Sequence, residues 1–493
     1  MNCKNIIQRL LSIVSMIIFG SVYISVLFYS LNKNCHIFPV SLLLFLTLLY
    51  LFISKVDFRT FFNFFTIMFV IQLFFGYFLM VEYSTWDVYA VTKNARALAT
   101  GDVFNPVYFA SYPNNLAILL LFRFVFGACN SILGTTSIYA LVILNIFAID
   151  ISILFAVKFV EITYQKELAY RAGIMMTFFA PFYLYVPICY TDTFSLPFVT
   201  GLIYWFESSE HDPAKIKKWK YYANLSAIGI GLFVGYKLKG SLIILLIAML
   251  IYLFIKLPFS TFCKITGILL IGFTCAALLW SLGMNTSDLI DDALYETHQM
   301  PTTHWVMMGL QGSGNYNSDD VNFTRSFSTY QDKQTATIQK IYERINRMGI
   351  TGTLQQFFNK ASKYGWNYGT CYAERYLGDT GDQPKIKNIL HEFILTNGSY
   401  HQYFFVITQS IWLIYFGLAA LNYLTEVPRG SMITFFLRMS LIGCMVFFMI
   451  WETHPRYILH FTPILILLAA IQMGNIADKL SCYIKSKNQE GKI

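Results

Sequence analysis

The sequence predicts an all-α polytopic membrane protein, and two observations carry that prediction. First, 56% of the 493 residues are hydrophobic and 18% are aromatic, whereas only 13% are charged. A soluble core of this size has no room for so many large apolar side chains. Second, apolar runs of roughly 17–23 residues recur along the chain, which is the helix length that crosses about 30 Å of hydrocarbon. The ten-residue alternation typical of membrane β-barrels is not visible.

The apolar runs and the basic residues between them predict about twelve transmembrane helices. Lysine and arginine concentrate in cytoplasmic loops, and every predicted inner segment is basic when both ends of the chain lie inside. These basic runs are solvated rims, so the net charge of +9 gives no reason to expect a nucleic-acid partner. The predicted spans lie near residues 10–30, 38–54, 60–82, 136–157, 170–188, 194–207, 222–238, 241–256, 264–282, 403–423, 432–451 and 457–474.

Two further apolar or amphipathic stretches are predicted to lie in the outer membrane interface. Residues 114–127 form a short apolar run that contains Arg123, and counting it as a span would reverse every later loop. We therefore predict an interfacial or re-entrant helix there. Residues 88–100 are amphipathic and form the other outer helix.

This topology divides the chain into three parts. Residues 1–282 form an N-terminal membrane module, and its first outer loop, residues 82–135, is the candidate catalytic loop. Residues 283–402 form a mixed extracytoplasmic loop or cap with weak helical patterning, and residues 403–493 form the last helices and a cytoplasmic tail. The nine cysteines are scattered without a CxxC motif, as expected for small apolar side chains.

Asp87 is the most informative residue, because it follows the outer end of a long apolar segment. A carboxylate where a membrane helix meets water is costly to desolvate, and it is a functional-site hypothesis by default. The same topology brings further ionisable residues to the outer boundary. Cations there suit the phosphate of an anionic lipid, and a carboxylate suits proton abstraction from a hydroxyl. These residues are Asp87, Asp192, Lys237, Lys239, Glu452, His454 and Arg456.

All of these residues except His454 also have a structural explanation. Asp87 and Asp192 both stand where an acid serves as a helix N-cap. Lys237 and Lys239 suit snorkelling to the interface, and Glu452 and Arg456 have the spacing of a local ion pair. The neighbours His304 and Trp305 suit an interfacial anchor, because Trp is common at headgroup level.

Taken together, several segments resemble the GT-C superfamily of membrane glycosyltransferases, which use polyprenyl-phosphate sugars. The resemblance covers most of the chain, and the nearest pattern is the protein O-mannosyltransferase-like branch. The stretch from Thr303 to Leu310 is further similar to Gram-positive envelope members that add sugar side chains to polysaccharides. The segments that carry the resemblance are Asp87 with its amphipathic helix, Tyr112-Pro-Asn-Asn115, Tyr190-Thr-Asp192, Lys239-Gly-Ser241 and Glu452 to Tyr457.

The resemblance implies an inverting glycosyltransferase with Asp87 as general base. The donor phosphate would then be held by Lys239, Arg456 and Lys237. Many relatives carry adjacent acids in the first outer loop, whereas Val88 and Tyr89 follow Asp87 here. We therefore predict no obligatory cofactor and no tightly bound divalent metal. The expected substrate-binding residues are Tyr89, Tyr108, Tyr112, Asn114, Asp192, His304, Trp305 and Glu452.

The expected partners are a polyprenyl-phosphate-linked monosaccharide, a cell-envelope polysaccharide or other extracytoplasmic glycan acceptor, and membrane lipids. The expected location is the plasma membrane, with the active site on the extracytoplasmic face. A competing class is a transporter or flippase of lipid-linked sugars. Such proteins usually show inverted repeats and broken helices near the midplane, whereas this sequence shows no repeat and few charges at mid-depth.

Overall fold

The computed structural model describes residues 3–80, 86–211, 217–287, 289–378, 389–425 and 432–490, so residues 82–85 of the candidate loop lie outside it. The described residues form helices and turns without a β-strand, which confirms the all-α prediction. The elements from the first half are α1 Cys3–Lys33, α2 Ile37–Ile53, α3 Phe58–Phe78, α4 Asp87–Thr100, α5 Pro106–Ser111, η1 Pro113–Asn115, α6 Leu116–Leu133, α7 Tyr139–Thr163, α8 Lys166–Thr177, α9 Pro181–Leu184, α10 Thr191–Phe194, α11 Leu196–His211, α12 Lys218–Leu238, η2 Gly240–Leu242 and α13 Ile243–Lys256. Those from the second half are α14 Phe259–Asn285, α15 Asp292–His298, α16 Thr302–Gly309, α17 Ser318–Arg325, α18 Tyr330–Asn359, η3 Lys360–Gly365, α19 Ala373–Gly378, α20 Ile389–Ile394, α21 His401–Leu424, α22 Met432–Ile450, η4 Pro455–Phe461 and α23 Thr462–Glu490.

Eight helices in the described ranges are long and apolar enough to cross a membrane, so the count of twelve is not confirmed. Two of the other predicted spans, α2 and α13, are apolar helices of only 17 and 14 residues. The helix α6 counts among the eight by length and composition, and its interfacial placement stays a prediction. The eight candidates are Lys4–Lys33, Phe58–Phe78, Pro113–Leu133, Tyr139–Thr163, Phe259–Asn285, His401–Leu424, Met432–Ile450 and Pro455–Lys487.

The predicted span 170–188 is wrong as a single helix. The helix α8 ends at Thr177, α9 covers only four residues, and α11 begins only at Leu196. Pro181 and Pro187 explain the interruption, since proline lacks the N–H of the helical ladder and its ring clashes with the preceding turn. The break turns the chain so that Tyr190 and the residues after it reach the candidate site.

Polar side chains from neighbouring helices satisfy the backbone at this break. The side-chain amide of Asn145 donates to the carbonyl oxygens of Tyr185 and Val186 at 2.8 and 2.9 Å, and Gln72 donates to that of Phe182 at 3.1 Å. Asp150 is also buried nearby on α7, with 5% of its surface exposed. Non-helical backbone inside a membrane protein needs such partners. The bundle interior therefore holds polar side chains at this break, and Asp150 is the ionisable one among them.

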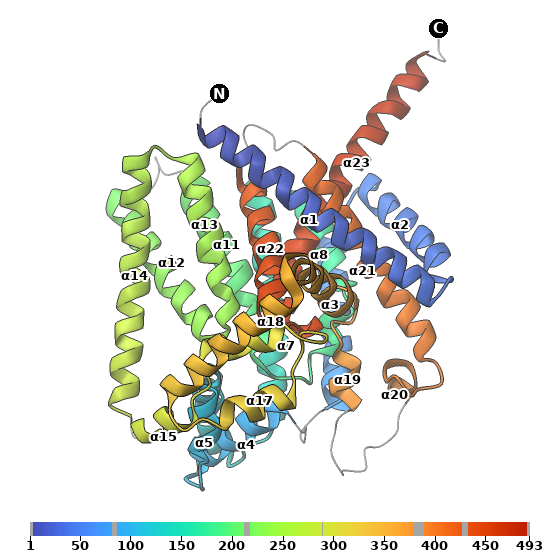
Figure 1. Ribbon diagram of the computed structural model, residues 1–493. Helices are drawn as coiled ribbons and strands as arrows, with labels where there is room; N and C mark the ends of the chain where they lie inside the picture. The colour runs from blue at the N-terminus through green and yellow to red at the C-terminus, as the bar shows by residue number, and fades with distance from the viewer. Residues whose placement is uncertain are drawn as a thin grey trace.

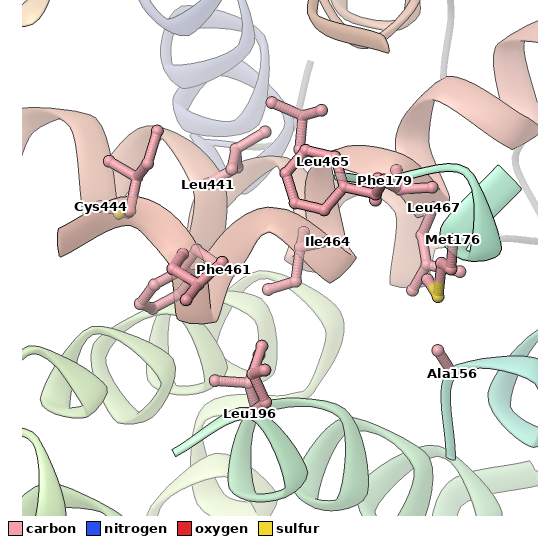
Figure 2. Close-up of a cluster of buried hydrophobic side chains, with 14 of the residues drawn as sticks. Ala156, Met176, Phe179, Leu196, Leu441, Cys444, Phe461, Ile464, Leu465 and Leu467 are labelled. Carbon is pink, nitrogen blue, oxygen red and sulfur yellow. The ribbon is translucent and has the colours of Figure 1, made fainter. Parts of the chain in front are cut away.

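The bundle is centred on α23, whose first half packs against α8, α21 and α22. The apolar side chains of this first half are almost fully buried, and dispersion contacts between close-packed side chains hold such membrane bundles together. Figure 2 shows buried side chains from several elements meeting in this region, among them Met176, Phe179, Leu196, Leu441, Cys444, Phe461, Ile464, Leu465 and Leu467.

A helical cap covers the end of the bundle opposite the chain termini. Both termini lie at the top in Figure 1, whereas α4, α5, α15 and α17 lie at the bottom. The part of residues 283–402 that the structure describes is built from helices and turns, which corrects the mixed region predicted for it. A buried ion pair joins two of these helices, since Arg344 of α18 makes two hydrogen bonds of 2.9 and 2.6 Å to Asp320 of α17.

Candidate active site

Asp87 is the first residue of α4, and its carboxylate faces a group of tyrosines instead of capping the helix. The N-cap residue is Trp86, which makes no side-chain capping bond. Tyr108 donates its hydroxyl proton to Oδ1 of Asp87 at 2.7 Å, and the hydroxyl of Tyr190 lies 3.3 Å from Oδ2. The Asp87 side chain remains 39% exposed. This acid is therefore both held in place and open to a substrate.

Asn115 connects the two tyrosines that face Asp87. Tyr190 donates to Oδ1 of Asn115 at 2.7 Å, and the amide nitrogen of Asn115 donates to the hydroxyl oxygen of Tyr108 at 2.8 Å. The resulting chain of donors ends on Asp87. Its neighbour Asn114, the residue named from the sequence, is exposed. The short 3-10 turn η1 turns Asn115 inward in its place.

Burial keeps these two tyrosines protonated. It raises the pKa of Tyr108 and of Tyr190 well above the usual value, and the nearby charge of Asp87 raises both further. A tyrosine with a raised pKa is a hydrogen-bond donor throughout the physiological range. Tyr108 therefore donates to the Asp87 carboxylate, and Tyr190 donates mainly to the amide oxygen of Asn115.

Arg456 lies on the other side of Asp87, with Nη2 at 3.8 Å from Oδ2. Its guanidinium carbon lies 4.5 Å from the ring centre of Trp86 and 5.2–5.4 Å from those of three tyrosines. In the part of the chain that the structure describes, the buried Nε and Nη1 atoms have no hydrogen-bond partner. The aromatic cage is formed by Trp86, Tyr190, Tyr376 and Tyr457.

Asp192 and Lys239 form a closed ion pair beside this cage. The ammonium of Lys239 contacts Oδ1 of Asp192, and the two side chains are 12% and 1% exposed. Asp192 lies in α10, whose N-cap is Tyr190, so the capping explanation of Asp192 is not what the structure shows. The ring of Tyr457 lies 5.4 Å from the Lys239 ammonium. The pair connects the broken segment to the end of α12.

Glu452 is a second buried acid, and it accepts a hydrogen bond of 3.1 Å from the hydroxyl of Tyr457. Among the described residues, it forms no ion pair with Arg456, whose nearest carboxylate is that of Asp87. Burial raises the pKa of Glu452 to about 7, although Arg456 and the bond from Tyr457 lower it. Its protonation state therefore changes near neutral pH.

Lys237 lies apart from these groups, although the sequence suggested that it joins them. Its ammonium lies 5.4 Å from the ring centre of Trp280 on α14. Trp280 also lines a groove of about 310 Å³ between α6 and α14, and the exposed Arg123 lines the same groove. Lys237 therefore belongs to this lateral surface and not to the cage around Arg456.

The remaining predicted residues lie around the site in two groups. The ring of Tyr112 lies 5.4 Å from that of Tyr108, and its hydroxyl is 3.5 Å from Arg325 of the cap. Tyr89 lies on α4, with the Lys93 ammonium 5.7 Å from its ring centre. Both are partly exposed near Asp87.

His304 and Trp305 lie in the cap helix α16. His304 is buried against Thr324 at 2.7 Å, and burial lowers its pKa to about 4, so the imidazole is neutral at pH 7. Trp305 stacks on Trp451 with ring centres 5.8 Å apart. Trp451 precedes the turn that carries Glu452 and Arg456, so α16 contacts that turn directly. His454, in the same turn, lies 3.2 Å from the hydroxyl of Tyr376.

No group of three His, Cys, Asp or Glu side chains suited to a metal ion occurs in the described ranges. The expectation that no divalent metal is required stays a prediction.

Sequence reasoning missed five contributors to the site, Asn115, Trp86, Tyr457, Tyr376 and Tyr190, the last of which begins a segment that carries the resemblance. Asn115 is the neighbour of a residue that it named, and Trp86 and Tyr457 directly adjoin Asp87 and Arg456. An aromatic residue next to a charged one at a membrane boundary is a usable signal for a cation–π contact. Tyr376 gave no local signal, since it reaches Trp86 from the cap with ring centres 4.3 Å apart.

Comparison with known proteins places the chain among integral membrane proteins. Residues 10–477 match the model of a family described as conserved hypothetical integral membrane protein. The chain belongs to this family. With the eight candidate spans, the family makes the protein a multi-pass membrane protein. No curated protein matches the chain.

Among solved structures, the chain is similar to the oligosaccharyltransferase of Archaeoglobus fulgidus. The form tethered to an acceptor peptide gives a TM-score of 0.45 at 11% identity, and the apo form gives 0.47 at 12%. A complex of the same enzyme, AglB, with an inhibitory peptide and a dolichol-phosphate gives 0.42 at 12%. These alignments cover 87–88% of this chain and 51–52% of the other, so the chain spans about half the length of that enzyme. Similarity at this level does not decide the function.

Proposed function

We propose that the protein is a membrane glycosyltransferase that moves a monosaccharide from a polyprenyl-phosphate donor to a cell-envelope polysaccharide. The observation that carries this proposal is the half-open carboxylate of Asp87, which is held by Tyr108 and faces Arg456 at 3.8 Å. An exposed base beside a caged cation suits a reaction in which a hydroxyl loses a proton while a phosphate leaves.

The proposed reaction is a single displacement at the anomeric carbon. Asp87 takes the proton of the acceptor hydroxyl, and the acceptor oxygen forms the new bond to the anomeric carbon from the side opposite the phosphate. The bond between that carbon and the phosphate oxygen breaks, and its electron pair leaves on the polyprenyl phosphate. The configuration at the anomeric carbon is inverted.

Arg456 is the cation that we propose for the departing phosphate. Its Nε and Nη1 groups have no acceptor among the described residues, and a phosphate oxygen beside Asp87 would supply one. Charge-assisted bonds from arginine to phosphate are strong and directional. Lys239 is already paired with Asp192. Its proposed contribution to phosphate binding is the positive charge that its ammonium places next to Arg456.

We propose that Lys237 contributes to donor binding at the lateral surface near α14 and not in the cage around Arg456. We propose that the hydrocarbon chain of the donor lies in the groove between α6 and α14, which is lined mainly by apolar side chains. Arg123 lines this groove and the Lys237 ammonium lies 5.4 Å from the ring of its lining residue Trp280, and two such cations suit an anionic lipid that approaches laterally. Both side chains would steer the phosphate toward Lys239, two residues beyond Lys237.

The sugar and acceptor sites are proposed around the exposed side of Asp87. Aromatic faces pack on sugar CH groups, and amides and carboxyls bind hydroxyls. The proposed lining residues are Tyr89, Tyr108, Tyr112, Asn114 and Trp305, and the buried Asp192, His304 and Glu452 would support them from behind. The cap in residues 283–402 would close over the acceptor, and the site would face the extracytoplasmic side of the plasma membrane.

The test is transfer by the purified protein from a labelled polyprenyl-phosphate monosaccharide. Asp87→Asn is expected to lower transfer by about a hundredfold or more, as for the loss of a general base. Asp102→Asn removes an exposed acid just beyond the other end of α4 and serves as the matched control. Normal transfer by a folded Asp87→Asn protein would end the assignment of Asp87 as the base.

A second candidate function is transport of lipid-linked sugars, and the break between α8 and α11 favours it. Broken helices with buried polar partners occur in transporters, and Asn145, Gln72 and Asp150 surround this break. Release of free lipid phosphate in the labelled assay indicates transfer. Movement of the intact lipid across vesicles, with no release, indicates transport.

A further inference from the structure

Lys360 is a buried lysine in the cap that reaches the turn carrying Glu452 and Arg456. It is the first residue of η3, a π-helical turn that follows α18 and contacts α22. Its side chain is fully buried, and its ammonium lies 2.6 Å from the carbonyl oxygen of Trp451 and 3.4 Å from that of Ile450. These carbonyls end α22, where the helical ladder leaves acceptors without partners. Lys360 therefore caps α22 from outside.

Two glycines leave the space for this side chain. A Cβ on Gly314 would lie 2.7–2.9 Å from three carbon atoms of the Lys360 chain, and Gly314 has φ of +73°, which other residues rarely adopt. A Cβ on Gly309 would lie 2.7 Å from the ammonium and 2.8 Å from the carbonyl oxygen of Ile450. The loop from Gly309 to Gly314 therefore fits closely around Lys360 and the end of α22.

The same loop also contacts the turn itself. The backbone N–H of Thr453 donates to the carbonyl oxygen of Gly314 at 2.8 Å. Trp451 is further held by stacking on Trp305. The turn from Trp451 to Arg456 is thus attached to the cap through Lys360, Gly314 and Trp305. Its position depends on the cap as well as on the two membrane helices that it joins.

A lysine is a costly choice for this position. Burial lowers the pKa of Lys360 to about 7, although the nearby charge of Glu452 raises it. An apolar side chain would avoid the desolvation of an ammonium but would leave the end of α22 without its donor. The side chain is therefore suited to bonding the two carbonyl oxygens and not only to filling space.

We propose that Lys360 is a positioning residue, which fixes the turn from Trp451 to Arg456 so that the Arg456 guanidinium lies beside Asp87. This inference rests on the proposed function for its effect on transfer, but its structural part does not. A shift of about 1 Å in such a group can cost about a hundredfold in rate.

The experiment compares Lys360→Met with Lys360→Arg and with Lys363→Met, which changes an exposed lysine of the same turn. Hydrogen–deuterium exchange of residues 451–457 is the first readout, in purified full-length protein. We expect exchange there to rise by about tenfold in Lys360→Met, since a local contact is lost. It should stay unchanged in Lys363→Met, and Lys360→Arg should restore part of the protection.

Transfer kinetics are the second readout. In Lys360→Met the loss is expected mainly in kcat, with a small change in KM for the acceptor, because the cation beside the leaving phosphate is displaced. Unchanged exchange in residues 451–457, or an equal loss in Lys363→Met, would overturn the proposal. If exchange rises in Lys360→Met but the wild-type protein shows no transfer, the positioning role stands and the proposed function does not.

A second variant covers the case in which Lys360→Met does not fold. Gly314→Ala leaves the lysine in place but pushes on its chain. It is expected to raise exchange in residues 451–457 and to lower kcat in the same direction. Unchanged exchange and unchanged kcat in a folded Gly314→Ala protein would count against the proposal.

Discussion

The two acids Asp87 and Asp192 have similar positions in the sequence and opposite surroundings in the structure. Each stands at the start of a helix after an apolar segment. Asp87 remains 39% exposed and accepts from the Tyr108 hydroxyl, with Arg456 at 3.8 Å. Asp192 is 1% exposed and is paired with Lys239. One acid is open to a substrate, and the other is closed by its own cation.

This difference teaches that a boundary acid acquires its role from its partners. Neutral tyrosine donors leave Asp87 its charge and an accessible face, which suits proton transfer. A buried lysine neutralises Asp192, which suits the fixing of one chain segment against another. Variants of the two acids should therefore separate catalysis from stability.

The largest expected effect lies in transfer. Asp87→Asn should lower transfer by about a hundredfold or more with little change in the free energy of unfolding, because a half-exposed side chain is replaced by one of the same shape. The measurement is transfer from the labelled donor beside thermal unfolding in detergent. A large loss of stability would mean that Asp87, like Asp192, is structural.

Asp192→Asn should show the opposite pattern. It leaves the Lys239 ammonium buried without its carboxylate, which typically costs about 3–5 kcal/mol of unfolding free energy. The double variant Asp192→Asn with Lys239→Met removes both charges and should recover part of this loss. Chemical denaturation in detergent measures both proteins. If Asp192→Asn lost no unfolding free energy, the pair of Lys239 and Asp192 would be accessible to water in the membrane.

Much of the fold could be predicted, since apolar length and the distribution of basic residues report directly on membrane helices. The broken span after α8 could not, because the partners that satisfy it, Asn145 and Gln72, are distant in sequence. Apolar residues continue through the break, so hydropathy alone predicts a single helix there. Pro181 and Pro187 were the sequence signals that indicated a break in the helix.

The candidate site could be predicted to within one or two residues. The predicted topology placed Asp87, Lys239 and Arg456 at one end of the bundle. In the structure Arg456 lies beside Asp87, and Lys239 pairs with Asp192. Lys237 lies apart from them, because it belongs to the last turn of α12, whereas Lys239 follows the end of that helix with an extended backbone. The role of Lys237 in donor binding stays a prediction. Asn115 replaced Asn114 because a 3-10 turn decides which amide is buried.

A smaller effect concerns pH and extends the comparison to Glu452. Its pKa rises from the usual 4.5 to about 7 through burial, so the stability from its protonated form is present below pH 4.5 and lost as pH rises through about 7. The nearby Lys360 has a pKa lowered from 10.5 to about 7, so stability rises again between those values. Stability should therefore be lowest near pH 7.

Thermal unfolding across pH 4.5–10 checks this minimum. Glu452→Gln should remove the fall in stability between pH 4.5 and about 7. Lys360→Met should remove the rise in stability above about pH 7. The charged and hydroxyl groups near the pair, Asp87, Arg456 and Tyr457, are unchanged in both variants. A flat wild-type profile would show that neither group titrates near neutral pH.

The smallest effect tests how far the tyrosines make Asp87 different from Asp192. Tyr108→Phe removes the 2.7 Å bond to Asp87 and leaves the Asn115 amide without its acceptor. Since one bond to a charged group is worth about 1.5 kcal/mol at the lower end of its range, transfer should fall by about tenfold. Tyr342→Phe, which changes an exposed tyrosine of α18, is the control. If Tyr108→Phe matched the control, Arg456 alone would hold Asp87, and the contrast between the two acids would reduce to the exposure of one and the burial of the other.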